Sequence, residues 1–522
     1  MALFRKKGSA LLLLAAIILL ALGWLKWCNR LPSLTSRATS TVVLDTSSTA
    51  LGRSISPQVE AHPGLSGIYP LRDARDAFAT RVHLARQAER TLDVQYYIWR
   101  SDMTSTLLTR ALCDAADRGV RVRLLLDDNN TFGLDEILAA LDSHPNIEVR
   151  LFNPFVIRTP RVGYLTDFFR ANRRMHNKSF TADNQATIIG GRNVGDEYFG
   201  AAEEGLLFVD LDVLAIGPVV TDVSHDFDRY WESASSYPAA RILPAVNSVE
   251  IDKVKAAASR VEQDPSAITY MTALRDTPFV RHLANRTLEM DWAVTHMISD
   301  DPAKGLGQAS AEKLFPRRLK GVIGEPASHV EMVMAYFVPT AAGVNSLVSM
   351  AKRGVKIRIV TNSLEATDGP YVYAGYAKRR KALLEAGIEL YELRRLSPHL
   401  KGDKGSGSAP GSSGSSLHAK TFAIDGKRIF VGSYNFDPRS AKLNTELGFV
   451  IDSPELADGI SKTFETIIPE RAYKIHLSTD GKIYWIERTA NGDICYDKEP
   501  NTSFWLRAAV WLMSKLPIEW LL

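Results

Sequence analysis

The chain has 522 residues, of which 45% are hydrophobic and 23% charged, and its formal net charge is +4. This length and composition predict two or three globular domains with sizeable cores and argue against a disordered protein. The small net charge excludes an overall basicity of the nucleic-acid-binding kind, and three scattered cysteines, Cys28, Cys113 and Cys495, argue against a disulfide framework and a cysteine-based zinc site.

An apolar run near the N-terminus predicts a single-pass membrane anchor within residues 1–30. Gly8 to Leu25 carries no charge, and a helix of that length would rise about 27 Å, roughly the hydrocarbon thickness of a bilayer. A cleaved signal peptide is the alternative, although its apolar region is usually shorter. The basic residues 5–7 before the run favour a cytoplasmic N-terminus and a body on the other side. The Ser/Thr-rich segment 31–60 is expected to be a linker that lets the body stand off the membrane.

Two stretches repeat one order of elements. Residues 91–99 have the β-branched and aromatic character of a buried strand, 104–116 have the apolar spacing of a helix, and 120–126 predict a second strand. The same order of strand, helix and strand returns at 330–338, 342–352 and 355–361, and an Arg-Gly pair follows each helix. Strand, helix and strand in succession predict βαβ units, so we expect an α/β fold of two tandem repeats, each a mixed, mostly parallel sheet flanked by helices.

One polar motif also occurs twice, as H-x-K-x₄-D followed by G-[GS]-x-N. The first copy consists of His176, Lys178, Asp183 and Asn193, and the second of His418, Lys420, Asp425 and Asn435. Each H-x-K is expected to lie on a strand, whose alternation would turn the histidine and the lysine to one face. Identical spacing in both copies indicates one site built from both halves of the chain.

These residue types suit chemistry at a phosphodiester. A neutral imidazole can attack phosphorus, and a neighbouring lysine can neutralise the non-bridging oxygens. Asn193 and Asn435 can donate hydrogen bonds to the same oxygens, and Ser433 can add another. One histidine would then serve as nucleophile and the other as general acid for the leaving alkoxide. The lysines supply the charge that a metal would bring, so neither a metal nor another cofactor is expected; the sequence has no H-E-x-x-H motif and no carboxylate cluster beside the histidines.

The paired motif resembles the phospholipase D superfamily, over about residues 66–452. Two further stretches, RVRLLLDDNNTFGLDEILAALDSHPNIEVRLFNPF and NRRMHNKSF, look like the bacterial cardiolipin synthase branch in its third, single-anchor subgroup. The resemblance implies two phospholipase D-type repeats, at 61–250 and 326–500, that join at one central site, and a bacterial inner-membrane location. The intervening segment 251–325 is expected to connect them without a chemical role.

The resemblance also implies roles for single residues. It favours His176 as the nucleophile that forms a phosphohistidine, with His418 as the general acid, and gives Asp183 and Asp425 a structural task. Members carry a downstream acid that bonds the far nitrogen of each histidine. Glu446 fits that place in the second repeat and Asp210 in the first, with Asp212 as the alternative to Asp210.

Two regions bear on the substrate. Residues 150–178 combine phenylalanines with six arginines, Arg150, Arg158, Arg161, Arg170, Arg173 and Arg174, a mixture that suits either nucleic-acid bases or an anionic lipid surface. Segment 501–522 holds three tryptophans and is broken by Pro517, so we expect an interfacial amphipathic segment or a helix packed on the core. A membrane partner at both ends favours a lipid substrate and no nucleic acid.

We therefore expect a cardiolipin synthase-like transfer of a phosphatidyl group to phosphatidylglycerol. The alternatives are a membrane-associated phospholipase D that forms phosphatidic acid, a phosphodiesterase or nuclease, and, in another class, an inactive lipid-binding scaffold. The Gly/Ser-rich stretch 397–416, directly before His418, is expected either to gate the acceptor or to be a plain insertion.

Overall fold

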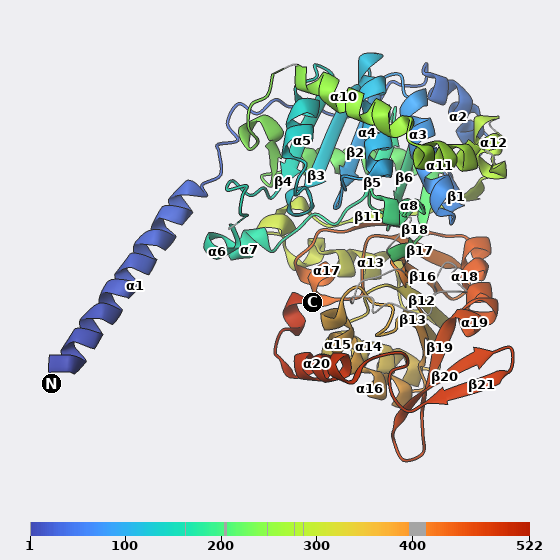
Figure 1. The fold of residues 1–522 in the computed structure, drawn as a ribbon. Coiled ribbons are helices and arrows are strands. Elements are labelled where there is room, and N and C mark those ends of the chain that lie inside the picture. The colour runs from blue at the N-terminus through green and yellow to red at the C-terminus, as the bar shows by residue number, and fades with distance from the viewer. Residues whose placement is uncertain are drawn as a thin grey trace.

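The computed structural model describes residues 2–161, 163–202, 206–247, 249–275, 277–285, 287–395 and 414–522. It has two halves, each built on one large sheet with helices against it, and the sheets meet in the middle of the molecule (Figure 1). Most of the proposed gating stretch, residues 397–413, lies outside the described residues.

The first sheet has nine strands and contains the first copy of the motif. In spatial order it consists of β10 (Asp291–Ala293), β1 (Ser66–Leu71), β8 (Asp212–Ile216), β6 (Ala186–Gly190), β5 (Ser179–Ala182), β2 (Thr91–Tyr96), β3 (Arg121–Asp127), β4 (Ile147–Phe152) and β9 (Ser236–Pro238).

The second sheet has ten strands and contains the second copy. Its order is β11 (Thr295–Ser299), β18 (Leu447–Ile451), β17 (Arg428–Gly432), β16 (Lys420–Ile424), β12 (His329–Met334), β13 (Lys356–Asn362), β14 (Glu389–Leu393), β19 (Ala472–Leu477), β20 (Ile483–Thr489) and β21 (Gly492–Tyr496).

The two predicted βαβ units are confirmed, but the expectation of mostly parallel sheets is wrong. β2, β3 and β4 run parallel, as do β12, β13 and β14, whereas the other neighbours in both sheets pair antiparallel. The reason is local: short turns join the motif strands, such as β5 to β6 and β16 to β17, and a tight hairpin can only be antiparallel.

Helices flank both sheets. In the first half they are α2 (Ala50–Glu60), α3 (Ala74–Gln87), α4 (Met103–Asp117), α5 (Asp135–Asp142), α6 (Gly163–Thr166), α7 (Phe168–Ala171), α8 (Asp196–Phe199) and α9 (Pro218–Trp231). In the second half they are α13 (Phe315–Ile323), α14 (Thr340–Lys352), α15 (Pro370–Ala377), α16 (Arg380–Glu385), α17 (Pro438–Lys442), α18 (Pro454–Thr466), α19 (Ile468–Arg471) and α20 (Phe504–Lys515). Two of them, α9 and α18, contribute side chains to the apolar cluster between the sheets. Gly119 and Gly354, directly after α4 and α14, adopt φ of +94° and +92°, as expected of helix-ending glycines.

The connecting segment is more than a spacer. After α10 (Val249–Glu262), α11 (Pro265–Arg275) and α12 (Pro278–Ala284), it contributes β10 to the edge of the first sheet and β11 to the edge of the second. A buried apolar cluster with residues from both sheets, including Ile189, Val213, Val431 and Phe449, lies between them. The two repeats therefore pack as one body, which fixes the motif copies relative to each other.

The motif aspartates hold the beginnings of β2 and β12. Asp183, at φ +51°, accepts backbone hydrogen bonds from Glu89, Arg90 and Thr91, and Asp425, at φ +54°, accepts them from residues 327–329. Each carboxylate thus ties the turn after a motif strand to the start of the neighbouring strand. This geometry supports a structural task and no proton transfer.

Replacing Asp183 by alanine is expected to lower the free energy of unfolding by about 3 kcal/mol, because three backbone N–H groups would lose a buried, charged acceptor. Urea unfolding followed by tryptophan fluorescence measures it. Asp458→Ala, at an exposed i,i+4 ion pair with Lys462, is the control and should change stability by less than about 0.5 kcal/mol. Equal stabilities for the two variants would contradict the structural role of Asp183.

The N-terminal region differs from the prediction in two ways. Helix α1 (Ala2–Cys28) projects from the body (Figure 1), but in the part of the chain that the structure describes no helix combines the length and apolar character needed to cross a bilayer. The segment after it is not a free linker: the Arg37 guanidinium donates to the carbonyls of Ser233 and Ser236, and the Val42 amide donates to Asp228. Residues 50–60 form α2, whose Leu51 and Ile55 are buried in the first core.

The C-terminal segment forms a helix that packs on the core, which is one of the two predicted alternatives. Val510 of α20 is buried in the second core, with Leu506 and Met513 packed beside it. The opposite side carries large exposed apolar side chains, at Phe504, Trp505, Trp511 and Leu512.

Candidate active site

Both motif histidines lie on the wall of one cavity of about 400 Å³. His176 and His418 contribute to it together with Asn193 and Asn435, so the predicted meeting of the two motif copies occurs. The remaining wall comes from both repeats and from the C-terminal segment. It consists of Tyr97, Ile98, Arg100, Asn129, Asn130, Tyr164, Asn172, Arg174 and Tyr198 on the first side, and of Tyr336, Asp368, Tyr371, Val372, Asp437, Arg439, Ser440, Asn444, Leu521 and Leu522 on the second.

The histidines lie just before the strands and not on them, which corrects the prediction. β5 begins at Ser179 and β16 at Lys420. The backbone amide of His176 donates to the carbonyl of Thr445, and that of His418 donates to Val209. The peptide before His418 forms β15 (Gly414–Leu417), which pairs with β7 (Leu206–Val209) of the first repeat. Each histidine is therefore held by a segment of the opposite repeat.

This crossed pairing brings an acid from one repeat to the histidine of the other. Thr445 directly precedes Glu446, whose Oε2 lies 2.8 Å from His176 Nδ1. Val209 directly precedes Asp210, whose Oδ2 lies 2.6 Å from His418 Nδ1. A proton on Nδ1 that faces a carboxylate leaves the lone pair of the imidazole on Nε2, which is the tautomer that a nucleophile or a proton acceptor needs.

The two acids reach their histidines by different means. At Gly191 an added Cβ would lie 2.1 Å from Asp210 Oδ1, so the short aspartate occupies the space that a side chain would fill. At the equivalent position Ser433 donates its only hydroxyl hydrogen to the longer Glu446 and accepts a bond from the Leu447 amide. Ser433 thus holds a carboxylate in this structure, whereas the sequence predicts that it contacts the substrate phosphate. Asp212, the alternative to Asp210, accepts hydrogen bonds from the Arg81 side chain and from the Arg192 amide.

The two motif lysines are buried beside their histidines. Lys178 Nζ donates to the carbonyl of His176 (2.6 Å), and Lys420 Nζ donates to the carbonyl of His418 and lies 2.9 Å from its Nδ1. Burial lowers the pKa of Lys178 to about 7 and that of Lys420 to about 8, against the raising effect of the nearby carboxylates. Both amino groups therefore change charge near neutral pH.

The motif asparagines are buried on the cavity wall. Asn193 accepts a hydrogen bond from the Ile98 amide through Oδ1, while its Nδ2 has no acceptor among the described residues. A buried amide donor without an acceptor is costly unless a ligand supplies one. Its position next to both histidines fits a phosphate oxygen.

The electrostatics of the two histidines are unequal. Burial, Lys178 and Lys420 lower the pKa of His176 well below its usual value, which keeps its imidazole neutral. Burial also lowers the pKa of His418, but Asp210 opposes the shift and the value remains about 4. Burial alone would raise the pKa of Asp210, but His418, Lys420 and Arg192 outweigh burial and bring this pKa to about 2. At Glu446 burial prevails and raises the pKa to about 7. His418 with its ionised partner is thus the better proton carrier of the two.

Comparisons with known proteins identify the family of the chain. A family model described as cardiolipin synthase, PLD-like domain, matches residues 82–231 and 319–468, one match in each repeat. The chain belongs to this phospholipase D-like family. Cardiolipin synthase C of Escherichia coli (strain K12) is 53% identical over 90% of this chain and 99% of its own length. An uncharacterized protein of Helicobacter pylori (strain ATCC 700392 / 26695) is 30% identical over 94% of this chain and 96% of its own length.

A solved structure shares the fold. Phosphatidylserine synthase of Haemophilus influenzae Rd KW20 superposes with a TM-score of 0.56 at 12% identity, covering 90% of this chain and all of that one. The cardiolipin synthase branch of the phospholipase D superfamily, which the motifs resembled, is therefore confirmed, as is the fold of two repeats.

The arginines of the basic stretch 150–178 are bound inside the protein and do not form an exposed basic patch; Arg161, for example, pairs with Asp128 and Asp135. Others bind carboxylates and carbonyls inside the first half: Arg150 with Glu148 and the Trp231 carbonyl, Arg158 with Asp128 and Asp135, Arg170 with Asp167, and Arg174 with Asp127. Arg173 donates to the carbonyls of Lys304 and Lys442. The sequence could not show this, because most of these acceptors are distant in the chain.

Sequence reasoning missed two residues behind the site. Asp300, in the connecting segment, accepts a hydrogen bond from the Glu446 amide (3.0 Å) and pairs with buried Lys304 (2.8 Å). Lys304 also donates to the carbonyl of Ser440. They hold the peptide that carries Glu446, and since they belong to no repeated pattern, only the fold reveals them.

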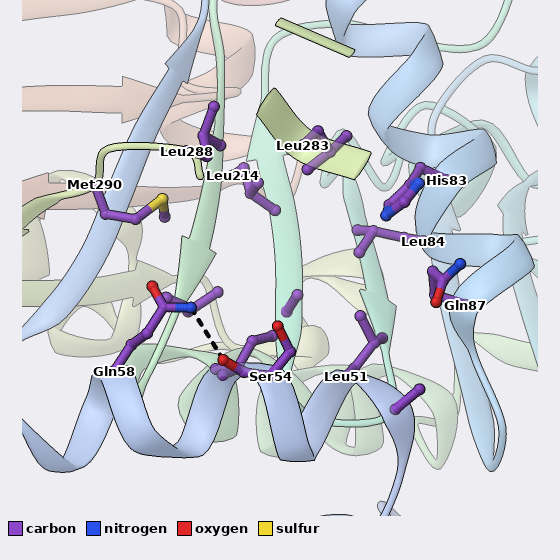
Figure 2. A pocket seen from close by; sticks show the side chains of 14 residues that line it. Leu51, Ser54, Gln58, His83, Leu84, Gln87, Leu214, Leu283, Leu288 and Met290 are labelled. Carbon is purple, nitrogen blue, oxygen red and sulfur yellow. Dashed lines mark hydrogen bonds between the residues drawn. The ribbon is translucent and has the colours of Figure 1, made fainter. Parts of the chain in front are cut away.

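A second cavity, shown in Figure 2, lies away from this chemistry. It opens between α2 and α3 over β6 and β8, and Leu51, Leu84, Leu214, Leu283 and Leu288 give it a mainly apolar lining. Gln58 donates to the Ser54 carbonyl at its rim. It contains no residue of the repeated motif, and we assign it no role in the reaction.

The buried lysines predict a pH dependence. As pH rises through about 7 to 8, Lys178 and Lys420 lose their protons and with them the charge that neutralises a substrate phosphate, so kcat/KM is expected to fall. Initial rates at substrate concentrations below KM, measured across this range, give the profile. A kcat/KM that stays constant up to about pH 9 would contradict it.

Proposed function

We propose that the protein is a cardiolipin synthase-type phosphatidyltransferase that works through a phosphohistidine on His176. One observation carries the proposal: two histidines from different repeats lie on one cavity wall, each backed by a carboxylate from the opposite repeat. The identity of 53% to a protein named cardiolipin synthase C supports the choice of phosphatidyl transfer.

The first half-reaction forms a covalent intermediate. The lone pair on His176 Nε2 attacks the phosphorus of a donor phospholipid, and the bond between phosphorus and the headgroup oxygen breaks. His418 gives its proton to the leaving alkoxide, while Lys178, Lys420 and Asn193 stabilise the charge on the non-bridging oxygens. An anionic phosphate in the buried cavity raises the pKa of His418 towards the protonated state that this step requires.

The second half-reaction transfers the phosphatidyl group. His418, now neutral, takes the proton from a glycerol hydroxyl of phosphatidylglycerol, and the hydroxyl oxygen attacks phosphorus. The bond between phosphorus and His176 Nε2 breaks, cardiolipin leaves, and the starting protonation states return. Water in place of the lipid hydroxyl would give phosphatidic acid, so the acceptor side of the cavity decides between transferase and hydrolase.

The unequal histidines support this order of roles. His176, held neutral by burial and two lysines, has the free-base imidazole that a nucleophile needs. His418, paired with an ionised Asp210, keeps the higher proton affinity that suits an acid and base.

We place the reaction at a membrane, with the body on the non-cytoplasmic side. Wall residues and exposed apolar residues alternate on the same short elements: Tyr164 of α6 lines the cavity while Leu165 is 66% exposed, and Leu521 of η5 (Glu519–Leu521) lines it while Trp520 is 51% exposed. α1, α6, α7 and α20 all lie on one side of the body (Figure 1). A lipid headgroup can thus enter the cavity while the acyl chains stay in the bilayer, to which α1 attaches the protein.

Changing Trp505 and Trp511 to serine is expected to weaken binding to phosphatidylglycerol vesicles about tenfold, because these exposed rings enter the interface. Cosedimentation with vesicles measures the affinity. Ile494→Ser is the matched control: Ile494 is 45% exposed on β21, on the opposite side of the body, and should bind as the unchanged protein does. Equal losses at both places would contradict the proposed orientation.

The test of the function is product formation by purified protein from labelled phosphatidylglycerol, alone and with other phospholipids. Cardiolipin is the expected product, and it should form in EDTA because the lysines supply the positive charge. Phosphatidic acid alone would make the protein a hydrolase. Cleavage of added DNA without any lipid product would refute both lipid reactions.

A further inference from the structure

The catalytic cavity differs between its two sides. On the first-repeat side its polar wall consists of amides, phenols and two arginines, each paired with an acid outside the lining: Asn129, Asn130, Asn172, Tyr97, Tyr164, Tyr198, Arg100 and Arg174. On the second-repeat side two carboxylates, Asp368 and Asp437, join Tyr336, Tyr371 and Arg439, whose guanidinium donates to Asn172 and to the Leu521 carbonyl. A carboxylate repels a phosphate but accepts hydrogen bonds from hydroxyl groups, so the second side suits a polyhydroxyl ligand.

Tyr336 and Asp368 form a defined pair on this wall. Tyr336 follows β12, Asp368 lies in the loop before α15, and the phenol donates to Asp368 Oδ2 at 2.7 Å. Tyr336 is half-buried and Asp368 is exposed, so the pair borders the open space. Asp368 is also among the charges that raise the pKa of Lys420, which locates it near His418 and its lysine.

Asp437 adds a buried carboxylate to the same wall. It is 7% exposed, and its Oδ1 caps the N-terminus of α17 by accepting a bond from the Ser440 amide (2.6 Å). The cap explains how the aspartate is held but not why it lines the cavity. Its charge, like that of Asp368, acts on Lys420.

The first repeat has no counterpart of this pair. Trp99 bridges to Val194 in the first repeat as Phe337 bridges to Phe436 in the second. The residues just before them, Ile98 and Tyr336, therefore occupy equivalent positions, and an isoleucine cannot hydrogen-bond a ligand. Among the described residues, carboxylates line the cavity only on the side that carries His418.

We propose that Tyr336, Asp368 and Asp437 form the acceptor subsite, which binds the free glycerol hydroxyls of the acceptor and presents one of them to His418. The headgroup leaves phosphorus, and the acceptor hydroxyl attacks it, on the side opposite the bond to His176. The leaving headgroup and the acceptor therefore use this subsite in turn, and His418 serves both. The inference rests on the proposed function and adds the recognition of a vicinal diol to it.

The test compares acceptors that differ in hydroxyl groups. Full-length protein is supplied with phosphatidyl-p-nitrophenol as donor, and with phosphatidylglycerol, glycerol or 1-butanol as acceptor. Each product is counted per p-nitrophenol released, so a general loss of activity cancels. In Asp368→Asn and Tyr336→Phe, transfer to phosphatidylglycerol and to glycerol should drop about tenfold or more relative to hydrolysis, because a hydrogen bond to a charged group is lost. Transfer to butanol, which has no second hydroxyl, should stay within about twofold.

Tyr391→Phe is the matched control, because Tyr391 donates to Glu389 at 2.9 Å on β14 in a like pair outside the cavity. It should leave all three product ratios unchanged. The proposed subsite would be overturned if Asp368→Asn and Tyr336→Phe reduced transfer to glycerol and to butanol equally. It would also be overturned if they reduced neither transfer. An unchanged protein that uses glycerol and butanol but makes no cardiolipin would instead refute the proposed function, while the glycerol ratios would still decide on the subsite.

Discussion

Replacing His176 by alanine is expected to lower turnover by at least about 10⁴-fold, because it removes the proposed nucleophile that forms the covalent intermediate. The release of p-nitrophenol from phosphatidyl-p-nitrophenol, followed by rapid mixing, should lose its initial burst as well as its steady state. p-Nitrophenolate leaves without a general acid, so the burst reports attack by the nucleophile alone.

His418→Ala should behave differently with the same substrate. A burst of about one equivalent should remain, and turnover should then stop, because no base activates the acceptor. His225→Ala, at an exposed histidine of α9, is the control and should keep both phases. A His418→Ala variant with normal turnover of phosphatidylglycerol would contradict a site shared between the repeats.

The second large effect on the rates is expected from Glu446 and Asp210, each of which binds the histidine of the opposite repeat. Glu446→Gln is expected to reduce the rate of the burst by about 10³-fold, because an amide no longer fixes the tautomer of His176 or accepts its Nδ1 proton. Asp210→Asn should leave the burst and slow turnover by a similar factor, because Asp210 serves His418. The same burst experiment on both variants measures this.

This comparison separates crossed from uncrossed pairing. If each acid served the histidine of its own repeat, Asp210→Asn would remove the burst and Glu446→Gln would preserve it. A further variant tests the same pairing. Gly191→Ser should displace the Asp210 carboxylate from His418, because the added Cβ would lie 2.1 Å from Asp210 Oδ1.

Much of the site could be predicted because it is written in the chain as a repeat. The equal spacing of His176, Lys178 and Asp183 with their second copies identified six residues without a structure, and the βαβ units followed from apolar periodicity. The resemblance then supplied Asp210 and Glu446.

The remainder depends on contacts between distant segments. The exchange of acids follows from the pairing of Met175 with Thr445 and of Leu417 with Val209, which joins the two repeats. No local pattern encodes that pairing. The same holds for Asp300 and Lys304, and for the arginines of residues 150–174, whose partners are assembled by the fold.

The sheets were misjudged for a related reason. The two βαβ units predict parallel order, but the motif strands continue each sheet as hairpins, and one edge of each sheet is a strand from the connecting segment. Periodicity along one strand does not specify its neighbour.

The central claim, a phosphatidyl group on His176, can be tested by locating the intermediate. His418→Ala is mixed with phosphatidyl-p-nitrophenol carrying ³²P, quenched in alkali, which preserves a phosphoimidazole, and digested for mass spectrometry. We expect about one label per chain, on the peptide that contains His176, and none in His176→Ala. Label on any other residue, or a labelled His176→Ala protein with the phosphate on His418, would contradict the account.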